Sequence, residues 1–304
     1  MVIALGRAAA SFLWTVPLPR DTLPGMSERY ECFEVSLSDG IAHLRMCRPE
    51  KRNSMIRSFW RELPEIIRTI DDGGEARVVV ISSTGPHFTA GMDLAVFAEG
   101  AGDDVAKVVR GVNTYDTIQV LQDTFSCLER CRVPVIAAVQ GGCIGGGVDL
   151  VTACDMRYAS ADAFFCVQEI NIGMTADVGT FPRLAKIIPE GVAREMAYTG
   201  RRLPADRARE IGLVNEVFAD AERLIEGVMQ VASEIAAKSP LAVYGSKRML
   251  NYARDHSTAD ALDYIGVWNA SMFQPAEMAE AFAAKREKRA GVFTPLPARR
   301  KPLG

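Results

Sequence analysis

The stretch from residue 133 to 150, VPVIAAVQGGCIGGGVDL, runs from an apolar segment into five glycines within seven positions. A short apolar run that ends in glycine is typical of a buried strand, and the residues after it have the pattern of a helix. A strand that turns through glycines into a helix exposes backbone N–H groups, which bind an anion or a developing oxyanion. The alternative is that the glycines only let the strand and the helix pack closely.

Two common nucleotide-binding motifs are excluded for this glycine run. The GxGxxG pattern needs glycines at offsets 0, 2 and 5, and no register in 141–147 supplies them. Gly141 and Gly146 have the spacing of a P-loop, but Gly147 stands where that motif requires lysine.

A second loop of small residues, HFTAGMDL at 87–94, follows the apolar run VVVISST at 78–84. The carboxyl ends of buried strands are where α/β folds bind ligands. Two such loops supply two backbone N–H donors, the minimum for a site that polarises a carbonyl group.

The chain from residue 30 onward predicts an α/β fold. CFEVSLSDGIAHLRMCR alternates about Asp39-Gly40 and predicts a β-hairpin. Strands and helices then alternate, which is typical of crossover connections, with strands at 76–85, 133–141 and 156–167 and helices at 54–70, 105–130 and 147–156. After residue 190 the pattern predicts helices, at 191–199, 204–211, 220–237, 240–252, 258–272 and 275–289.

Composition and charge limit the classes of partner. The 304 residues carry a net charge of −3, so no basic surplus indicates a nucleic acid partner. No apolar run reaches the roughly 18 residues that span a membrane. The seven cysteines show no CxxC pair and are predicted to be buried thiols of a reducing compartment. Neither they nor the three distant histidines suggest a metal site.

Residues 1–26 are basic, and the first acidic residue in them is Asp21. We interpret them either as a mitochondrial-type leader or as an extension upstream of a start at Met26. We expect this segment to lie outside the fold, before a core domain over 27–200 and a helical, oligomerising region over 201–304. No low-complexity linker separates these two parts, so we expect them to pack as one unit.

FTAGMDL and AAVQGGCIGGGVDLVTACDMRYASADAFF together resemble the crotonase family, the enoyl-CoA hydratases and isomerases, and the similarity covers about residues 30–290. The resemblance implies a crotonase-like ββα spiral core with a helical C-terminal region. It also implies an acyl-CoA thioester whose oxygen binds the backbone N–H groups of Met92 and Gly146, which would stabilise an enolate. The substrate contacts that it assigns are Ala90, Gly91, Met92, Asp93, Leu94 and Gly146, although Asp93 can alternatively serve only to hold the shape of its loop.

Three acidic residues follow the first glycines: Asp149, Glu169 in VQEINIG and Asp177 in MTADVGT. Taken singly, Asp149 and Asp177 can be helix caps and Glu169 a solvated residue. Their order and spacing resemble one subfamily of the crotonases, the Δ3,5-Δ2,4-dienoyl-CoA isomerases. The resemblance implies that all three are catalytic, with Glu169 serving C2, Asp177 serving C6 and Asp149 supporting them.

The implied isomerisation takes a proton from C2 and returns one at C6, which suits two separately positioned acid–base groups. Three carboxyl groups in one apolar pocket should have separated pKa values, with at least one raised towards neutrality. Two alternatives stay open. An enoyl-CoA hydratase would use Asp149 and Glu169 to activate water and leave Asp177 structural, and a non-catalytic binding protein would use none of them.

Coenzyme A is part of the substrate in this interpretation, and no separate cofactor or metal is implied. Its phosphates predict cations at the pocket mouth, for which Arg48, Lys51 and Arg52 are candidates. The family usually forms trimers that stack into hexamers, a role that suits residues 258–289, and Lys285 could reach a neighbouring subunit's ligand. The implied pathway is fatty-acid β-oxidation, in a bacterial-type cytoplasm or, if residues 1–25 are a transit peptide, in a mitochondrion.

Overall fold

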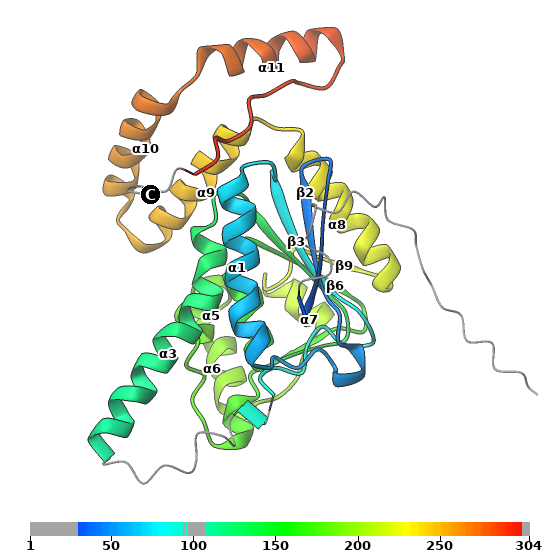
Figure 1. Ribbon diagram of the computed structural model, residues 1–304, viewed down its shortest axis with the longest axis vertical. Coiled ribbons are helices and arrows are strands. Elements are labelled where there is room, and N and C mark those ends of the chain that lie inside the picture. Colours follow the sequence, from blue (N-terminus) through cyan, green and yellow to red (C-terminus); the bar gives the residue numbers. More distant parts are fainter. Residues whose placement is uncertain (1–29, 94, 97–106, 300–304) are drawn as a thin grey trace, which may run out of the picture.

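The computed structural model describes residues 30–93, 95–96 and 107–299. The predicted leader at 1–26 and the predicted substrate contact Leu94 lie outside these residues. The described chain forms two β-sheets with helices packed around them (Figure 1). The larger sheet has the spatial order β1 (Phe33–Ser38), β2 (Ile41–Met46), β3 (Val78–Ser83), β4 (Val135–Val139), β6 (Met156–Ser160) and β9 (Glu216–Phe218).

The β1–β2 hairpin confirms the turn predicted at Asp39-Gly40. Both residues have positive φ, 52° and 76°, as the tight two-residue turn of a hairpin requires. β1 is antiparallel to β2, whereas β3, β4, β6 and β9 continue the sheet in parallel. The sheet is therefore of the α/β type that the alternation of strands and helices predicts.

The parallel strands are buried on both faces, as their unbroken apolar sequence predicts. In β3, Val79 and Ile81 face one core, and Val78 and Val80 alternate with them and face another. Figure 1 shows helices on opposite sides of the sheet. The first core is covered by α1 (Arg57–Gly73) and α3 (Lys107–Arg130), and the second by α8 (Ala221–Ala236).

The strand predicted at 156–167 is two strands in different sheets, so that prediction is wrong in detail. β6 belongs to the larger sheet, whereas the next strand pairs in a three-stranded sheet formed by β5 (Gly142–Ile144), β7 (Phe164–Cys166) and β8 (Leu203–Pro204). The turn between β6 and β7 closes with a 2.9 Å hydrogen bond from the Ala163 N–H to the Ser160 carbonyl oxygen. No glycine or proline marks this turn, so the sequence pattern does not show it.

Two strands followed by a helix recur along the chain. β4 and β5 lead into α4 (Gly146–Ala153), and β6 and β7 lead into the short helix η2 (Glu169–Ile172), then α5 (Thr180–Ile187) and α6 (Glu190–Thr199). Thr89, after β3, forms a bridge with Cys143 of β5 and so places a third segment beside the small sheet. This repeat is the ββα spiral that the resemblance implies.

The helices predicted after residue 190 are present, together with two strands that the sequence pattern did not predict. β8 and β9 have two and three residues, too few to show a period, and they form where β7 and β6 offer a partner. Besides α6 and α8, the helices of this part are α7 (Ala205–Glu210), α9 (Pro240–Asp255), α10 (Thr258–Met272) and α11 (Pro275–Glu287).

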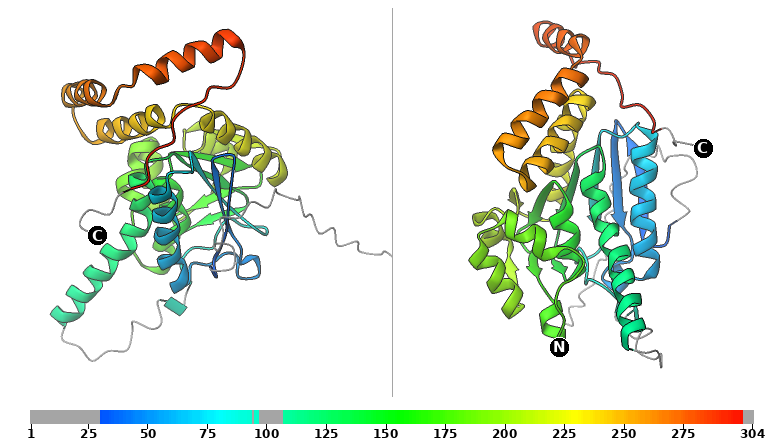
Figure 2. Two further views of the ribbon diagram at one scale, coloured as in Figure 1. Left: turned by 45° about the horizontal axis from the view of Figure 1, so that its top comes forward. Right: turned by 90° about the vertical axis from the view of Figure 1, so that its left-hand side faces the viewer.

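Helices α10 and α11 lie at one end of the molecule, away from the larger sheet (Figures 1 and 2). The chain after α11 returns to the body, where Leu296 is buried in the main core. The Arg299 N–H donates to the Asp72 carbonyl oxygen, and Arg132 donates from Nη1 to the Pro297 carbonyl oxygen, both at 2.9 Å. The C-terminal helices are therefore part of an excursion that ends on the core.

All seven cysteines are free thiols, as predicted. Five are buried, and Cys47 and Cys127 are half-buried. Burial raises the pKa of the Cys32 and Cys154 thiols to about 12, which keeps them protonated and unreactive.

We expect Leu63→Ala to lower the free energy of unfolding by about 2–5 kcal/mol, because Leu63 is fully buried on α1 and its loss leaves a cavity. Leu250→Ala in α9 is the matched control, since this leucine is 72% exposed. It should change the free energy of unfolding by less than about 0.5 kcal/mol. Urea denaturation measures both values, and equal losses in the two variants would contradict the assigned core.

Candidate active site

The two loops singled out in the sequence meet beyond the carboxyl ends of β3 and β4. Met92 forms a parallel bridge with Met55. The Met55 N–H donates to the Gly91 carbonyl oxygen at 2.8 Å, and the Asp93 N–H donates to the Met55 carbonyl oxygen at 3.1 Å. Because the residues on either side of Met92 make the bonds to Met55, the N–H of Met92 points to the opposite side.

The glycine loop lies on that opposite side, and its backbone comes too close for side chains. Gly91 and Gly145 have φ of 84° and 53°, which favour glycine. A methyl group on Gly91 would lie 2.7 Å from the Ile144 carbonyl oxygen. A methyl group on Gly146 would lie 3.9 Å from the Met92 nitrogen, so the two candidate donors belong to adjoining backbone segments.

The N–H groups of Met92 and Gly146 are available to a ligand. Gly146 opens α4, so its N–H is one of the helix-start donors that lack an intrahelical acceptor. Among the described residues, neither group donates in the main-chain hydrogen bonds found outside helices and strands. Two free backbone donors on touching loops form the arrangement that an oxyanion hole requires.

Asn53 organises the Met92 loop and was missed by the sequence analysis. This buried residue has φ of 52°, and its Oδ1 accepts from the Arg48 N–H at 2.9 Å. Its Nδ2 donates to the carbonyl oxygens of Thr84 and His87 at 2.8 and 3.1 Å. The one signal in the sequence is an asparagine after a charged run, because asparagine tolerates the left-handed conformation better than most residues.

Asp93 makes local hydrogen bonds that hold the loop. Its Oδ2 accepts from the Ser54 hydroxyl at 2.8 Å, and its Oδ1 accepts from the Ala95 N–H at 3.0 Å. These bonds, with smaller contributions from Arg48 and Lys51, lower the pKa of the Asp93 carboxyl group. The alternative given for Asp93, that it shapes the loop, accounts for its observed partners.

The candidate coenzyme A cations lie beside the same loop. Arg48 precedes the short helix η1 (Pro49–Lys51) and donates from Nη1 to the Ser54 carbonyl oxygen at 3.1 Å. Lys51 and Arg52 are exposed, and the Arg52 carbonyl oxygen accepts from the Ala90 N–H at 2.9 Å. In contrast, the helix α11 that carries Lys285 lies at the other end of the molecule, so one chain alone does not bring Lys285 to this site (Figure 1).

Asp149 lies in the first turn of α4 and is fully buried. Its Oδ1 accepts from the Thr180 N–H at 2.6 Å, so it caps the start of α5 rather than its own helix. Its Oδ2 has no hydrogen-bond partner among the described residues. Burial, and then the charge of Glu169, raise the pKa of Asp149 to about 7, against the opposing effect of Thr180.

Glu169 and Asp177 complete a cluster of three carboxyl groups. Glu169 opens η2, and a methyl group on Gly145 would lie 3.3 Å from its Oε1, so this carboxyl group adjoins the glycine loop. Its Oε2 is buried without a partner in the described part of the chain. Burial first, and then Asp177, raise the pKa of Glu169, and burial raises the pKa of the half-buried Asp177.

This cluster can exchange protons near neutral pH. Burial raises the pKa of all three carboxyl groups, and neighbouring carboxylates raise those of Asp149 and Glu169 further, so ionising all three at once is costly. Two buried oxygens, Asp149 Oδ2 and Glu169 Oε2, have no hydrogen-bond partner in the described part of the chain. The site therefore places two candidate oxyanion-hole donors beside a set of carboxyl groups with raised pKa values, an arrangement suited to proton transfer next to a carbonyl group.

Within residues 30–93, 95–96 and 107–299, no group of three or more His, Cys, Asp or Glu side chains is arranged to hold a metal ion. No helix formed by these residues is long and apolar enough to cross a membrane.

Comparison with known proteins identifies the family. A family model described as enoyl-CoA hydratase/isomerase matches residues 36–295. The chain belongs to the enoyl-CoA hydratase/isomerase family. Members similar to it include the mitochondrial Δ(3,5)-Δ(2,4)-dienoyl-CoA isomerase of Homo sapiens, 46% identical over 266 residues, which cover 86% of this chain and 80% of that protein. The peroxisomal isomerase of Arabidopsis thaliana is 37% identical over 275 residues, 88% of this chain and 99% of that protein.

Solved structures agree with this membership. An enoyl-CoA hydratase subunit I from Geobacillus kaustophilus HTA426 has a TM-score of 0.77 and 27% identity, covering 87% of this chain and 98% of that one. A putative enoyl-CoA hydratase from Streptomyces coelicolor A3(2) has a TM-score of 0.80, covers 91% of this chain and 99% of that one, and at 23% identity shows the fold alone. The crotonase-like fold predicted from the sequence is confirmed.

We expect the stability of this family member to depend on pH through Asp149. Its folded-state pKa of about 7 lies above the ordinary value of about 3.9, so the folded protein binds more protons between these pH values. The stabilisation is complete below about pH 4 and is lost as the pH rises towards 7. Asp149→Asn keeps an acceptor for the Thr180 N–H but does not titrate.

As the pH rises from about 5 to about 7, the free energy of unfolding of Asp149→Asn should therefore increase by about 2–3 kcal/mol relative to that of the wild type. Urea denaturation of both proteins across this range measures the difference. A difference that stays constant with pH would contradict a raised pKa at Asp149.

Proposed function

We propose that the chain is a Δ3,5-Δ2,4-dienoyl-CoA isomerase that converts a 3,5-dienoyl-CoA to a 2,4-dienoyl-CoA in fatty-acid β-oxidation. The observation that carries this proposal is the third carboxyl group, because Asp177 belongs to the same electrostatically coupled cluster as Asp149 and Glu169. The identity of 44–46% with the mouse and human dienoyl-CoA isomerases supports it.

The thioester oxygen binds the N–H groups of Met92 and Gly146 in this mechanism. These donors stabilise the negative charge that develops on the oxygen when C2 loses a proton. They are preorganised because the Met55 bridge and the start of α4 fix the two peptides before substrate arrives. Removal of one such donor typically costs about 3–4 kcal/mol of transition-state stabilisation.

Glu169 takes the C2 proton, and Asp177 delivers a proton to C6. The electrons of the broken C2–H bond form the C2=C3 double bond, those of C3=C4 move to C4=C5, and those of C5=C6 bond the incoming proton. Glu169 ends protonated and Asp177 ionised, so solvent resets both groups. Raised pKa values suit this exchange, because a protonated Asp177 must be present at neutral pH.

Asp149 supports both groups from the protein side. The charges of Glu169 and Asp177 add to burial in raising the pKa of Asp149, so its protonation depends on theirs. Its bond to the Thr180 N–H also ties α4 to the start of α5, three residues after Asp177. We assign it an electrostatic role and not direct proton transfer.

The substrate contacts proposed for the thioester are Ala90, Gly91, Met92, Asp93, Leu94 and Gly146, with Arg48, Lys51 and Arg52 for the coenzyme A phosphates. The substrate supplies the activated thioester itself, so no separate cofactor or metal is proposed. We also propose a homotrimer that stacks into a hexamer. Large apolar side chains exposed on α10, on α11 and at the junction between them support this assembly: Leu262, Val267, Met272, Phe273, Met278 and Phe282.

Relatives of the chain include mitochondrial and peroxisomal isomerases. For this chain we propose a mitochondrial location over a cytoplasmic one, with residues 1–25 as the transit peptide.

Enoyl-CoA hydration is the second candidate function. The unpartnered Asp149 Oδ2 and Glu169 Oε2 are suitable acceptors for a catalytic water. Two features of residue 149 count against hydration. The resemblance implies a longer glutamate at this position in hydratases, and the Asp149 carboxyl group already accepts from the Thr180 N–H. A non-catalytic binding protein is disfavoured, because unpaired buried carboxyl groups cost stability and would serve no purpose in it.

We expect Gly146→Pro to lower turnover by about 100- to 1,000-fold, because proline removes the N–H that binds the oxyanion. Proline is tolerated at the first position of a helix, which Gly146 occupies, so the fold should persist. Met92→Leu is the matched control, since it keeps its backbone N–H, and should change turnover by less than about threefold. A folded Gly146→Pro protein with normal turnover would rule out this donor.

The second expectation separates the two proton transfers. Asp177→Asn should abolish diene isomerisation while Glu169 and the oxyanion hole still exchange the C2 proton. In deuterated water this variant should incorporate deuterium at C2 of a 3,5-dienoyl-CoA without forming the 2,4-diene. Glu169→Gln should abolish both C2 exchange and product, because each amide is similar in size to the acid it replaces but can neither accept nor deliver the proton.

Mass spectrometry follows the deuterium, and absorbance follows the longer chromophore of the 2,4-diene. Deuterium at C2 with Glu169→Gln but not with Asp177→Asn would reverse the two roles. Full isomerase activity in Asp177→Asn would contradict the role of Asp177 at C6. A wild-type protein that forms no 2,4-diene but hydrates a 2-enoyl-CoA would contradict the isomerase proposal and establish the second candidate.

A further inference from the structure

Gln122 of α3 holds the backbone of Asp177, and no step of the proposed mechanism uses it. Its Nε2 donates to the Asp177 carbonyl oxygen at 2.6 Å. Its Oε1 accepts from the Gln119 side-chain amide at 3.2 Å. Because one end of the Gln122 amide accepts from Gln119, the other end is left as the donor towards Asp177.

The segment that carries Asp177 has few main-chain hydrogen bonds, although its neighbours Ala176 and Val178 pack into the main core. The Met174 N–H donates to the Glu169 carbonyl oxygen at 2.9 Å, which closes the turn after η2. Between there and α5, residues 175–178 take part in none of the main-chain hydrogen bonds found outside helices and strands in the described chain. Core packing therefore holds the residues on either side of Asp177, and the hydrogen bonds that orient the Asp177 peptide come from side chains of other elements.

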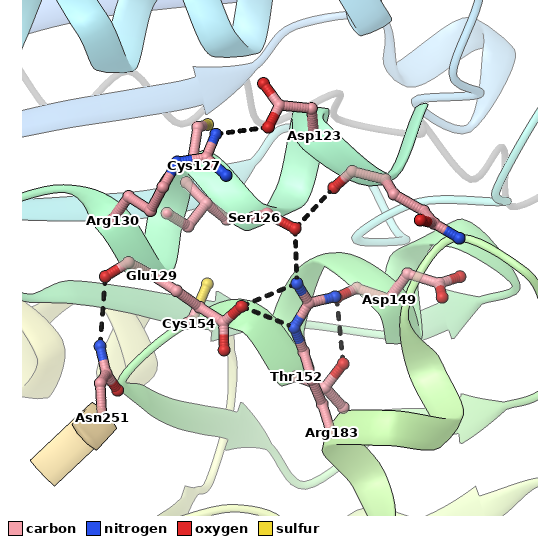
Figure 3. Close-up of polar contacts among 12 residues, drawn as sticks. Asp123, Ser126, Cys127, Glu129, Arg130, Asp149, Thr152, Cys154, Arg183 and Asn251 are labelled. Atoms are coloured by element: carbon pink, nitrogen blue, oxygen red, sulfur yellow. Dashed lines mark hydrogen bonds and ion pairs between the residues drawn. The ribbon is translucent and has the colours of Figure 1, made fainter. Parts of the chain in front are cut away.

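Arg183 of α5 lies against the same segment, and Figure 3 shows its guanidinium group bonded to Glu129 and Ser126 of α3. A methyl group on Gly179 would lie 1.8 Å from Arg183 Nη1, so the guanidinium group lies directly against the Gly179 backbone. The Nη2 of Arg183 donates to Glu129 at 2.7 Å and to the Ser126 hydroxyl at 2.9 Å, and both acceptors lie on α3. α3 thus holds the segment at two points, directly through Gln122 and through Arg183.

The other side of the segment is fixed by α4. Asp149 accepts from the Thr180 N–H at 2.6 Å, which leaves only Val178 and Gly179 between this anchor and the Asp177 peptide. With Thr180 bonded to α4 and Val178 buried in the core, the Gln122 bond holds the carbonyl end of the Asp177 peptide. The Asp177 side chain and the bonded carbonyl group share the same Cα atom. A rotation of this peptide therefore displaces the Asp177 carboxyl group.

We propose that Gln122 is a positioning residue for Asp177: its side-chain amide orients the Asp177 peptide so that the carboxyl group faces C6 of the substrate. This inference rests on the proposed function, because it assumes that Asp177 serves the second proton transfer. It assigns Gln122 no contact with the substrate. Loss of the amide should therefore slow protonation at C6 while the transfer at C2, served by Glu169, continues.

The test measures both transfers in the same protein. The full chain is incubated with a 3,5-dienoyl-CoA in deuterated water, and the 2,4-diene and deuterium at C2 are followed together. For Gln122→Ala we expect diene formation to fall at least tenfold, with C2 exchange within about twofold of the wild type and KM unchanged. Gln230→Ala, at an exposed glutamine of α8, is the control for glutamine truncation and should match the wild type.

Gln122→Glu is the second variant, because it keeps the length of the side chain but presents a carboxylate that cannot donate to the Asp177 carbonyl oxygen. The same selective loss is expected, and it covers the case in which the alanine variant fails to fold. Equal loss of exchange and diene formation would mean a purely structural role and overturn the proposal, as would unchanged diene formation in both variants. A wild-type protein that forms no diene would instead overturn the proposed function.

Discussion

The contact between two backbone segments, at Gly91 and at Gly145-Gly146, is the constraint on which the rest of the site depends. The two segments touch because the ββα repeat brings Thr89 beside β5, and a methyl group on Gly147 would lie 2.5 Å from the Thr89 side chain. The glycines therefore serve packing and chemistry together. The two interpretations of the glycine run, close packing and an anion site, are consequences of one geometry.

The carboxyl cluster adds an electrostatic cost that the fold must offset. Asp149 is fully buried with one unpartnered oxygen, and its neighbours raise its pKa further. Such groups are costly because desolvation disfavours their charged form. The cores on both faces of β3 supply the stability that offsets this cost. A protein with such a site is therefore less stable than one with apolar residues there. The same desolvation raises the pKa of Asp149 to about 7, so this carboxyl group exchanges its proton near neutral pH.

Much of the fold could be predicted from the sequence, because its long elements carry clear periods. The Asp39-Gly40 turn followed from its turn residues, and α1 and α8 followed from their apolar spacing. The short strands did not, since β8 and the turn between β6 and β7 depend on partners that are distant in the chain. Asn53 and Gln122 were missed for the same reason: each acts through bonds to residues about 30 or more positions away, and neither belongs to a motif.

The return of the chain to the core after α11 also affects which parts of the protein tolerate changes in length and sequence. Leu296 and Arg299 fasten the end of the C-terminal excursion to the core near α1, so α10 and α11 form a loop closed at its far end. The entropy of closing such a loop grows slowly, by about 0.6 kcal/mol for each doubling of its length. Insertions in α10 and α11 therefore add little to the free-energy cost of folding the core, whereas substitutions of their exposed apolar side chains would change the proposed subunit contacts. The excursion is the part of this architecture that is freest to acquire new surfaces while the carboxyl cluster stays unchanged.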